Sequence, residues 1–186
     1  MIMLILGLML FCAVHFVPSL APQLKSALHG KLGEGGYKGT FSLLLMLSFG
    51  LMIMGWRSAQ PELVYLPPVS LRHPAMLLVV VAFFLLAISN RPSGLRRWIR
   101  HPQLTGVMMW AIAHLLMNGD SRSVVLFGGM ALWSLIEIIA INRREGAWIK
   151  DPAPPLSTDL ISVAITAVVV AIVIAIHPYL SGMPVM

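Results

Sequence analysis

The stretch that decides the fold lies at residues 98–120 and reads WIRHPQLTGVMMWAIAHLLMNGD. It begins among arginines, and from Pro102 to Asn118 it contains no Asp, Glu, Lys or Arg. An uncharged run of this length falls at the lower end of the roughly 17 to 25 residues that a helix needs to cross a bilayer. We therefore expect a transmembrane helix with a basic rim at one end and a histidine, His114, toward the other.

The composition extends this expectation to the whole chain. Of its 186 residues, 58% are hydrophobic and 11% are charged, and the mean hydropathy is +0.86. Lipid offers no partners to exposed backbone groups, and the sequence lacks the alternation of barrel strands, so each apolar run is expected to be a helix. The sequence predicts an all-α, polytopic membrane helical bundle that forms a single domain over residues 1–186. We expect about six transmembrane helices, at residues 2–18, 40–56, 74–90, 102–118, 122–141 and 158–178.

The basic residues give this bundle an orientation. Ten of the thirteen lie in the first, third and fifth connections between the runs, and three lie in the second and fourth. Because Lys and Arg concentrate in cytoplasmic loops, we expect both termini to face away from the cytoplasm. The same argument makes the lipid bilayer, rather than nucleic acid, the expected partner of the positive charge. No basic segment precedes the first run, so we expect it to stay in place as a span.

The connections differ in their expected stiffness. In the first, we expect an interfacial helix followed by a tight turn at residues 33–39, GEGGYKG. In the second, Pro67 and Pro68 predict an extended segment. The chain has one cysteine, Cys12, so we expect neither an intrachain disulfide nor a cysteine metal motif. Hydrolytic signatures such as Glu-x-x-His are missing as well.

Three polar side chains inside the spans are candidates for chemistry, because polar groups in lipid are costly. His114 shares a helix face with Trp110, where a flat cofactor could stack; a neutral imidazole bonded to a neighbouring span is the equally weighted alternative. His15 precedes Pro18 near the end of its span, where an interfacial histidine is the favoured interpretation. For Glu137, an ion pair with Arg143, with Arg144 or with a basic residue of the third connection is favoured over acid/base chemistry.

His101 forms a second candidate at the basic rim, together with Arg96, Arg97 and Arg100. This cluster could attract an anionic cofactor, but it also satisfies the positive-inside rule, and we favour the second explanation. Thirteen residues separate His101 from His114, about 20 Å along a helix. We therefore expect the two histidines to belong to separate sites.

Several motifs resemble the NnrU family of bacterial membrane proteins. They are HPQLTG at residues 101–106, WAIAHLL at 110–116, LGEGGYKG at 32–39 and LFGG at 126–129, with smaller matches at Val14-His15 and Arg72-His73. The resemblance covers the chain to about residue 145. It implies a role associated with denitrification and nitric-oxide metabolism, with respiratory or denitrification membrane proteins as partners.

The NnrU family is in turn similar to the plastid 15-cis-ζ-carotene isomerase, which holds heme b with histidines. That resemblance implies heme b as the cofactor, His114 as one axial ligand, His15 as the second, and an isomerase-like redox activity. Ala111 stands where the isomerase carries a cysteine. Depth along the spans favours other pairs: His114 with His73 or His177, and His15 with His101.

Two alternatives stay open. The segment Arg100-His101-Pro102-x-x-x-Gly106 resembles the signature of isoprenylcysteine-type membrane methyltransferases, which implies S-adenosylmethionine bound near Arg100, His101 and Glu137. Alternatively, the protein is a non-enzymatic component that helps to assemble a respiratory complex. The sequence does not decide whether the protein is an enzyme.

Overall fold

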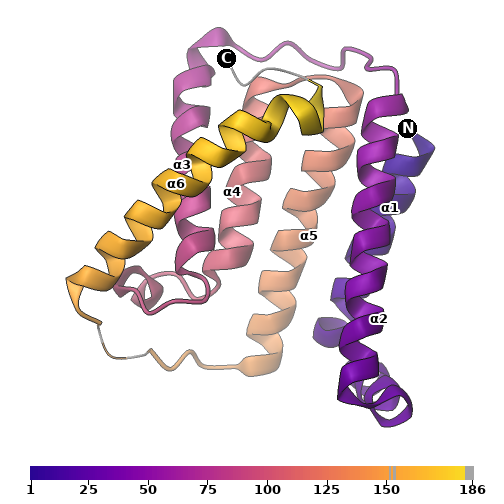
Figure 1. Ribbon diagram of the computed structural model, residues 1–186, viewed down its shortest axis with the longest axis vertical. Coiled ribbons are helices and arrows are strands. Elements are labelled where there is room, and N and C mark those ends of the chain that lie inside the picture. The colour runs from indigo at the N-terminus through magenta and orange to yellow at the C-terminus, as the bar shows by residue number, and fades with distance from the viewer. Residues whose placement is uncertain (151, 153, 183–186) are drawn as a thin grey trace.

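The computed structural model describes residues 1–150, 152 and 154–182, and this part of the chain folds into six α-helices. The predicted all-α fold is confirmed: the described residues contain no strand, and a single β-bridge joins Leu63 to Asp120. Figure 1 shows the helices side by side, most of them running between two common ends. They are α1 (Ile2–Leu20), α2 (Pro22–Ser58), α3 (Arg72–Ile88), α4 (Pro102–Met117), α5 (Ser121–Glu145) and α6 (Leu156–Ser181).

The lengths of the helices suit a multi-pass membrane protein. Five helices within the described residues are long and apolar enough to cross a bilayer: α1, α2, α3, α5 and α6. The sixth, α4, has 16 residues. At 1.5 Å per residue it spans about 24 Å, less than the roughly 30 Å of a hydrocarbon core. The stretch of sequence that predicts a membrane fold thus forms the shortest of the six α-helices. This helix packs between α3 and α5.

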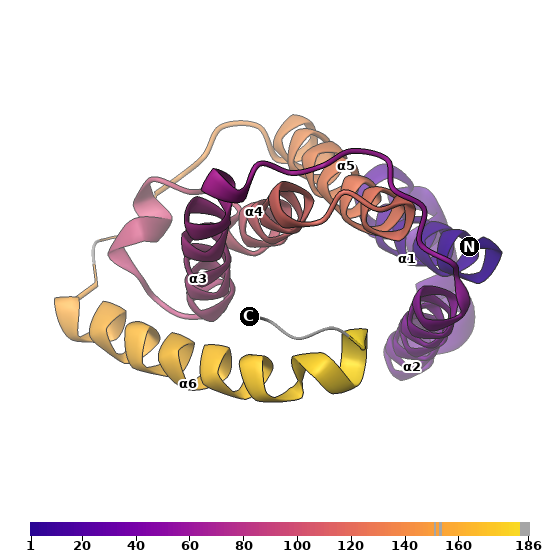
Figure 2. The ribbon, with the colours of Figure 1, turned by 90° about the horizontal axis from the view of Figure 1, so that it is seen from above.

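The six helices follow one another around the bundle in the order α2, α1, α5, α4, α3 and α6 (Figure 2). The first residue of α1 and the last residues of α6 lie at the same end of the molecule, which we call the termini end (Figure 1). The α3–α4 and α5–α6 connections lie at the other end, which we call the basic end because it carries most of the Lys and Arg residues. Helix α6 crosses α3 at a steep angle and also touches α2.

The first connection corrects one expectation. A helix is present at the start of α2, as predicted, and the chain turns at Gly33 alone, whereas residues 34–39 of the predicted turn are helical. Only Gly33 leaves the helical region, with φ 68° and ψ 172°, and the helix resumes at once. A left-handed φ at a single glycine is enough to redirect the chain. The following turn is helical, and Lys38 pairs with Glu34 at 2.6 Å across one turn.

Close helix contacts in the bundle depend on small residues, as is usual in membranes. Gly7 on α1 lies so near α2 that a Cβ there would stand 2.7 Å from the backbone nitrogen of Met52. Gly106 on α4 approaches α3 in the same way, since a Cβ on this glycine would lie 2.8 Å from the Ala82 carbonyl oxygen. The buried core lies mainly between α1, α2 and α5 and contains Leu4, Leu8, Phe11, Met52, Trp56, Phe127, Met130 and Trp133.

The α2–α3 connection forms a strap across the termini end. The backbone N–H groups of Val64 and Tyr65 both donate to the Gly119 carbonyl, at 2.8 and 3.0 Å. The Tyr65 hydroxyl donates to the carbonyl oxygens of Leu115 and Asn118 at the end of α4. A side chain at position 119 would overlap the Tyr65 backbone, so this turn requires glycine. As predicted, the strap then runs extended through Pro67 and Pro68 to η1 (Val69–Leu71).

Candidate functional site

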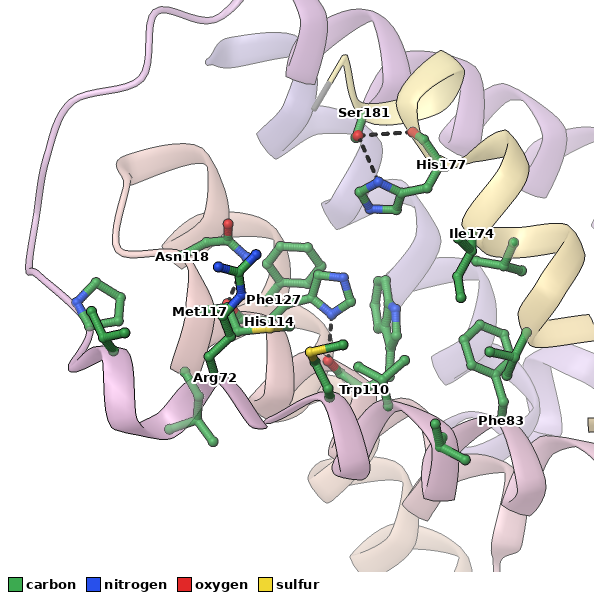
Figure 3. A pocket seen from close by; sticks show the side chains of 18 of the residues that line it. Arg72, Phe83, Trp110, His114, Met117, Asn118, Phe127, Ile174, His177 and Ser181 are labelled. Atoms are coloured by element: carbon green, nitrogen blue, oxygen red, sulfur yellow. Dashed lines mark hydrogen bonds between the residues drawn. The ribbon is translucent and has the colours of Figure 1, made fainter. Parts of the chain in front are cut away.

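A cavity of about 460 Å³ lies near the termini end, between α2, α3, α4, α5 and α6 (Figure 3). This volume is typical of small-molecule and cofactor sites, which are mostly apolar with a few polar groups. Aromatic and aliphatic side chains form most of the walls, among them Trp56, Met76, Phe83, Trp110, Phe127 and Ile174. The polar side chains at the cavity are Arg72, His114, Asn118, His177 and Ser181.

His114 is the best-positioned polar group in this cavity. It lies in the last turn of α4, and its Nδ1 is 2.8 Å from the Trp110 carbonyl oxygen. A carbonyl oxygen can only accept, so Nδ1 carries the ring proton, and in the neutral imidazole Nε2 keeps its lone pair. This is the tautomer of a metal-binding histidine whose other nitrogen is held by the backbone.

Aromatic rings hold the His114 imidazole in place. Its ring stacks on Phe127 of α5, with 4.3 Å between centroids and 26° between planes. Trp110 lies one turn before it, with the ring centroids 4.9 Å apart. The prediction that Trp110 and His114 occupy one helix face is therefore confirmed. The place of the isomerase cysteine, Ala111, is fully buried and is not among the cavity residues.

His177 lines the facing wall of the cavity, on the last turns of α6. Figure 3 shows the His114 and His177 side chains reaching the same space from two helices. The Ser181 hydroxyl lies 3.2 Å from His177 Nδ1 and donates to the His177 carbonyl at 2.9 Å. Trp56 Nε1 donates to the Ser181 carbonyl at 3.0 Å, which ties this end of α6 to α2.

Arg72 lies at the edge of the cavity, where α3 begins. Its side chain is exposed, and its guanidinium adds positive charge to an otherwise apolar space. A guanidinium at a cavity rim favours the carboxylates of a bound molecule. His73, the next residue, is exposed and is not among the cavity residues. His73 and His177 are the two histidines expected at the depth of His114, and of these the cavity contains His177.

His15 lies in different surroundings, between α1, α2 and α5. Its Nδ1 is 2.9 Å from the Phe11 carbonyl oxygen, which fixes the same tautomer as in His114. Its ring packs against Phe11, Phe41 and Trp133, at 4.2, 5.5 and 5.0 Å between centroids. His15 lines neither of the cavities found among the described residues. The structure therefore does not bring His15 and His114 together.

Glu137 corrects another expectation. It is 4% exposed, and Ser19 Oγ donates to its Oε1 at 3.0 Å. No ion pair forms between Glu137 and a basic residue within the described part of the chain. Arg144 lies almost two turns further along α5, where it donates to the Pro18 carbonyl at 2.6 Å and to Glu145 at 3.3 Å. The predicted pair with Arg143 or Arg144 is wrong because Glu137 faces α1, deep in the bundle.

Arg100 and His101 both contact the end of α5. Arg100 pairs with Glu145 at 3.2 Å and donates to the Gly146 carbonyl at 2.7 Å. His101 Nε2 is 2.9 Å from Asn142 Oδ1. Neither residue lines the His114 cavity, and Glu137 lies elsewhere on α5. These contacts connect the start of α4 to the end of α5, and no hydrogen bond or ion pair among the described residues links Glu137 to Arg100 or His101, as an S-adenosylmethionine site built from the three would require.

The sequence alone does not identify Phe127, Asn118 and Arg72 as residues of the His114 cavity. One signal for Phe127 is available: α4 and α5 form a hairpin around Gly119, which places residues before and after the turn at similar depths. In the described chain, no three His, Cys, Asp or Glu side chains gather to hold a metal ion.

Comparison with known proteins gives one match. A family model described as NnrU protein matches residues 3–185, nearly the whole chain. The resemblance inferred from the short motifs is confirmed and extends beyond residue 145 through α6. No curated protein and no solved structure matches this chain.

Proposed function

The chain belongs to the NnrU family, and from this premise we propose that it is a bacterial inner-membrane protein that binds heme b in the His114 cavity. The observation that carries the proposal is His114 itself, whose Nδ1 bonds the Trp110 carbonyl and whose Nε2 keeps its lone pair beside an apolar space of about 460 Å³. Axial imidazoles in heme proteins are commonly oriented by such a bond on the other ring nitrogen.

The residues around the cavity fit the chemistry of this group. Porphyrin is a flat, apolar ring with two carboxylates at one edge, and the cavity combines aromatic walls with an arginine, Arg72, at its rim. His114 would bind the iron, while Trp110 and Phe127 exclude water from it. When bound, a heme supplies one-electron transfer or a coordination site for a diatomic gas such as nitric oxide.

The second axial position has two candidates. The resemblance to the isomerase implies His15, which is packed among aromatic rings away from the cavity. His177 lines the same cavity as His114, on the helix that forms the facing wall. His177 would therefore be able to contribute from the cavity wall itself, whereas His15 lies on α1 and is not among the residues that line the cavity.

Visible spectra of the detergent-purified, heme-loaded protein test the proposal. We expect a Soret band at one heme per chain in the parent and a loss of about tenfold or more in bound heme for His114→Ala. His73→Ala, on the exposed start of α3, is the matched control and should retain the parent spectrum. A parent that binds no stoichiometric heme, or a His114→Ala protein with an unchanged spectrum, would sink the proposal.

The same variants identify the second ligand. If His177 supplies it, His177→Ala changes the low-spin spectrum of the ferric heme to a high-spin one, and His15→Ala leaves it unchanged. The reverse result would assign the ligand to His15.

We propose in addition that the bound heme serves nitric-oxide or nitrite metabolism, or an isomerase-like redox activity, with respiratory membrane proteins as partners. Family membership supports this context. The test is growth on nitrite of a deletion strain complemented with the parent or with His114→Ala, while nitric oxide is recorded. We expect nitric oxide to accumulate in the strain with the variant, and equal traces from the two strains would contradict the proposal.

A further inference from the structure

A second cavity, of about 330 Å³, lies at the basic end of the bundle, whereas the His114 cavity lies near the termini end. It is formed by the connection between α3 and α4, with the segment before α6 beside it. Three of its eight lining residues are arginines that belong to one short stretch of chain. The lining consists of Asn90, Arg91, Pro92, Ser93, Arg96, Arg97, Pro152 and Pro154.

No ion pair among the described residues offsets the charge of these three arginines. Among the described residues, no carboxylate lies within 4.0 Å of Arg91, Arg96 or Arg97. Arg96 Nη1 donates to the Arg91 carbonyl at 3.3 Å, a bond to a neutral acceptor. Arg91 Nε is buried and has no hydrogen-bond partner. A buried N–H of a charged group costs free energy unless an acceptor meets it, so this arrangement favours an anion.

The backbone of the connection is held in a defined shape. Ser93 is 3% exposed, and its Oγ accepts from the Leu95 N–H at 3.2 Å at the start of η2 (Gly94–Arg97). The Gly94 N–H donates to Asp159 Oδ2 at 3.2 Å, which fastens the turn to the first turn of α6. Asp159 itself is not among the cavity residues. The arginines are thus presented by a turn that is fixed before any ligand arrives.

We propose that Arg91, Arg96 and Arg97 form a binding site for a phosphate group, carried by a lipid headgroup or by a soluble phosphorylated molecule. Planar guanidinium forks match phosphate oxygens with two parallel hydrogen bonds each. Asn90 and Ser93 add neutral polar groups at the same cavity. Helix α3 ends at Ile88, so the site lies just beyond a membrane-spanning segment, at the level where lipid phosphates lie.

The positive-inside rule alone would not produce this arrangement. The rule requires cations on one side of the membrane but does not gather them around a cavity, and it leaves each side chain free to reach water. Arg143 illustrates the ordinary case: it is exposed at the end of α5, at the same end of the bundle, and lines neither cavity. It therefore provides a control in which the same charge is removed from a different place.

The test is titration of the purified full-length protein in a neutral detergent, monitored by calorimetry. One arm uses a short-chain phosphatidic acid, with the phosphatidylcholine of equal chain length as the neutral reference. The other arm uses inorganic phosphate and pyrophosphate. We expect saturable binding of at least one phosphate probe and no binding of phosphatidylcholine. Binding in the first arm alone identifies a lipid site, and binding of the soluble probes identifies a site for phosphorylated molecules.

Substitutions locate the binding. For Arg91→Gln and Arg97→Gln we expect the Kd to rise about tenfold or more, as loss of a charge-assisted pair implies, and for Arg143→Gln we expect no change. Arg91→Lys keeps the charge but loses the fork, and should also weaken binding. Arg97 is exposed, so we expect Arg97→Gln to fold. This variant therefore tests the proposal even if Arg91→Gln fails to fold. No saturable binding of any phosphate probe, or equal weakening by Arg143→Gln, would overturn the proposal.

Discussion

His15 and His114 make the same hydrogen bond in two different surroundings. Each imidazole directs Nδ1 to the carbonyl oxygen four residues earlier, at 2.9 Å in His15 and 2.8 Å in His114, and each ring contacts an aromatic residue of α5. Around His15, rings from α1, α2 and α5 fill the space. Beside His114 there is a cavity of about 460 Å³.

This difference shows that the helix alone can fix the tautomer that a histidine needs as a metal ligand. The helix alone does not provide a space beside Nε2 for a bound group. The Nδ1 bond is local and follows from helical geometry. The space beside Nε2 depends on which helices lie opposite. For His15 those are α2 and α5 with their aromatic residues, whereas residues of α3 and α6 line the cavity beside His114.

The largest expected effect comes from filling the cavity while leaving His114 intact. Val173 lies on α6 and lines the cavity, so Val173→Trp should reduce bound heme about tenfold or more by occupying the space of the ring. Val163→Trp on the same helix, at a position 53% exposed, is the matched control and should bind heme like the parent. Equal heme occupancy in the two variants would mean that the cavity is not the binding site.

A smaller effect should separate the two surroundings in stability. Trp133 packs against His15 and Phe11, and we expect Trp133→Ala to lower the free energy of unfolding by about 3 to 5 kcal/mol. Phe127→Ala should cost less, because a phenyl ring is smaller than an indole ring and Phe127 already borders the cavity. Reversible unfolding in mixed micelles measures both, with the outward-facing Leu132→Ala, 58% exposed in the parent, as reference. If Phe127→Ala lowered the free energy of unfolding more than Trp133→Ala does, the contrast between the packed surroundings of His15 and the open cavity beside His114 would be contradicted.

The smallest expected effect concerns the turn that joins the two helices at the His114 cavity. Asp120 caps α5, accepting from the Ser123 hydroxyl at 2.6 Å and from the backbone N–H of Arg122 at 3.1 Å. Burial opposes ionisation of the carboxyl, but the bonds from Ser123 and Arg122 outweigh it and hold the pKa of Asp120 below its ordinary 3.8. Asp120→Ala should lower stability at neutral pH by about 1 kcal/mol, the usual value of a cap.

The sign of the pH dependence follows from that direction. A carboxyl whose folded pKa is depressed contributes its full stabilisation above the unfolded value, and the contribution is lost as the pH falls through the folded value. The difference between parent and Asp120→Ala should therefore shrink below about pH 4. Glu62→Ala is the control, because Glu62 contacts Ser121 through backbone atoms. A difference that stays constant down to about pH 2 would refute the role of the charge.

The sequence predicts the helices well because membrane spans are local features. The apolar run at residues 102–118 ends one residue from the observed end of α4 at Met117. It predicts the region around Gly33 less well, since glycines permit a turn without requiring one, and only the first of the run leaves the helix. Local periodicity also places Trp110 and His114 on one face, as observed.

The cavity itself could not be predicted, because its walls come from five helices that meet through contacts distant in sequence. Trp56 and Ser181 are joined by a hydrogen bond although they lie 125 positions apart in the sequence. Neither segment contains a pattern that predicts contact with the other. For the same reason, the sequence identifies His177 only as one of two histidines at the depth of His114, and its place in the cavity wall follows from the packing of α6. Glu137 is a similar case: its nearest cations in sequence lie on α5, whereas its partner, Ser19, is on α1.

The position of α6 has a consequence for how the protein is made. This helix supplies one wall of the His114 cavity, yet it is the last of the six to be synthesised, and it packs mainly against α3. Until it docks, α4 presents His114 to an open side of the bundle. If the cavity holds the proposed heme, the heme would be able to enter while the first five helices are already inserted, before α6 closes that side of the cavity.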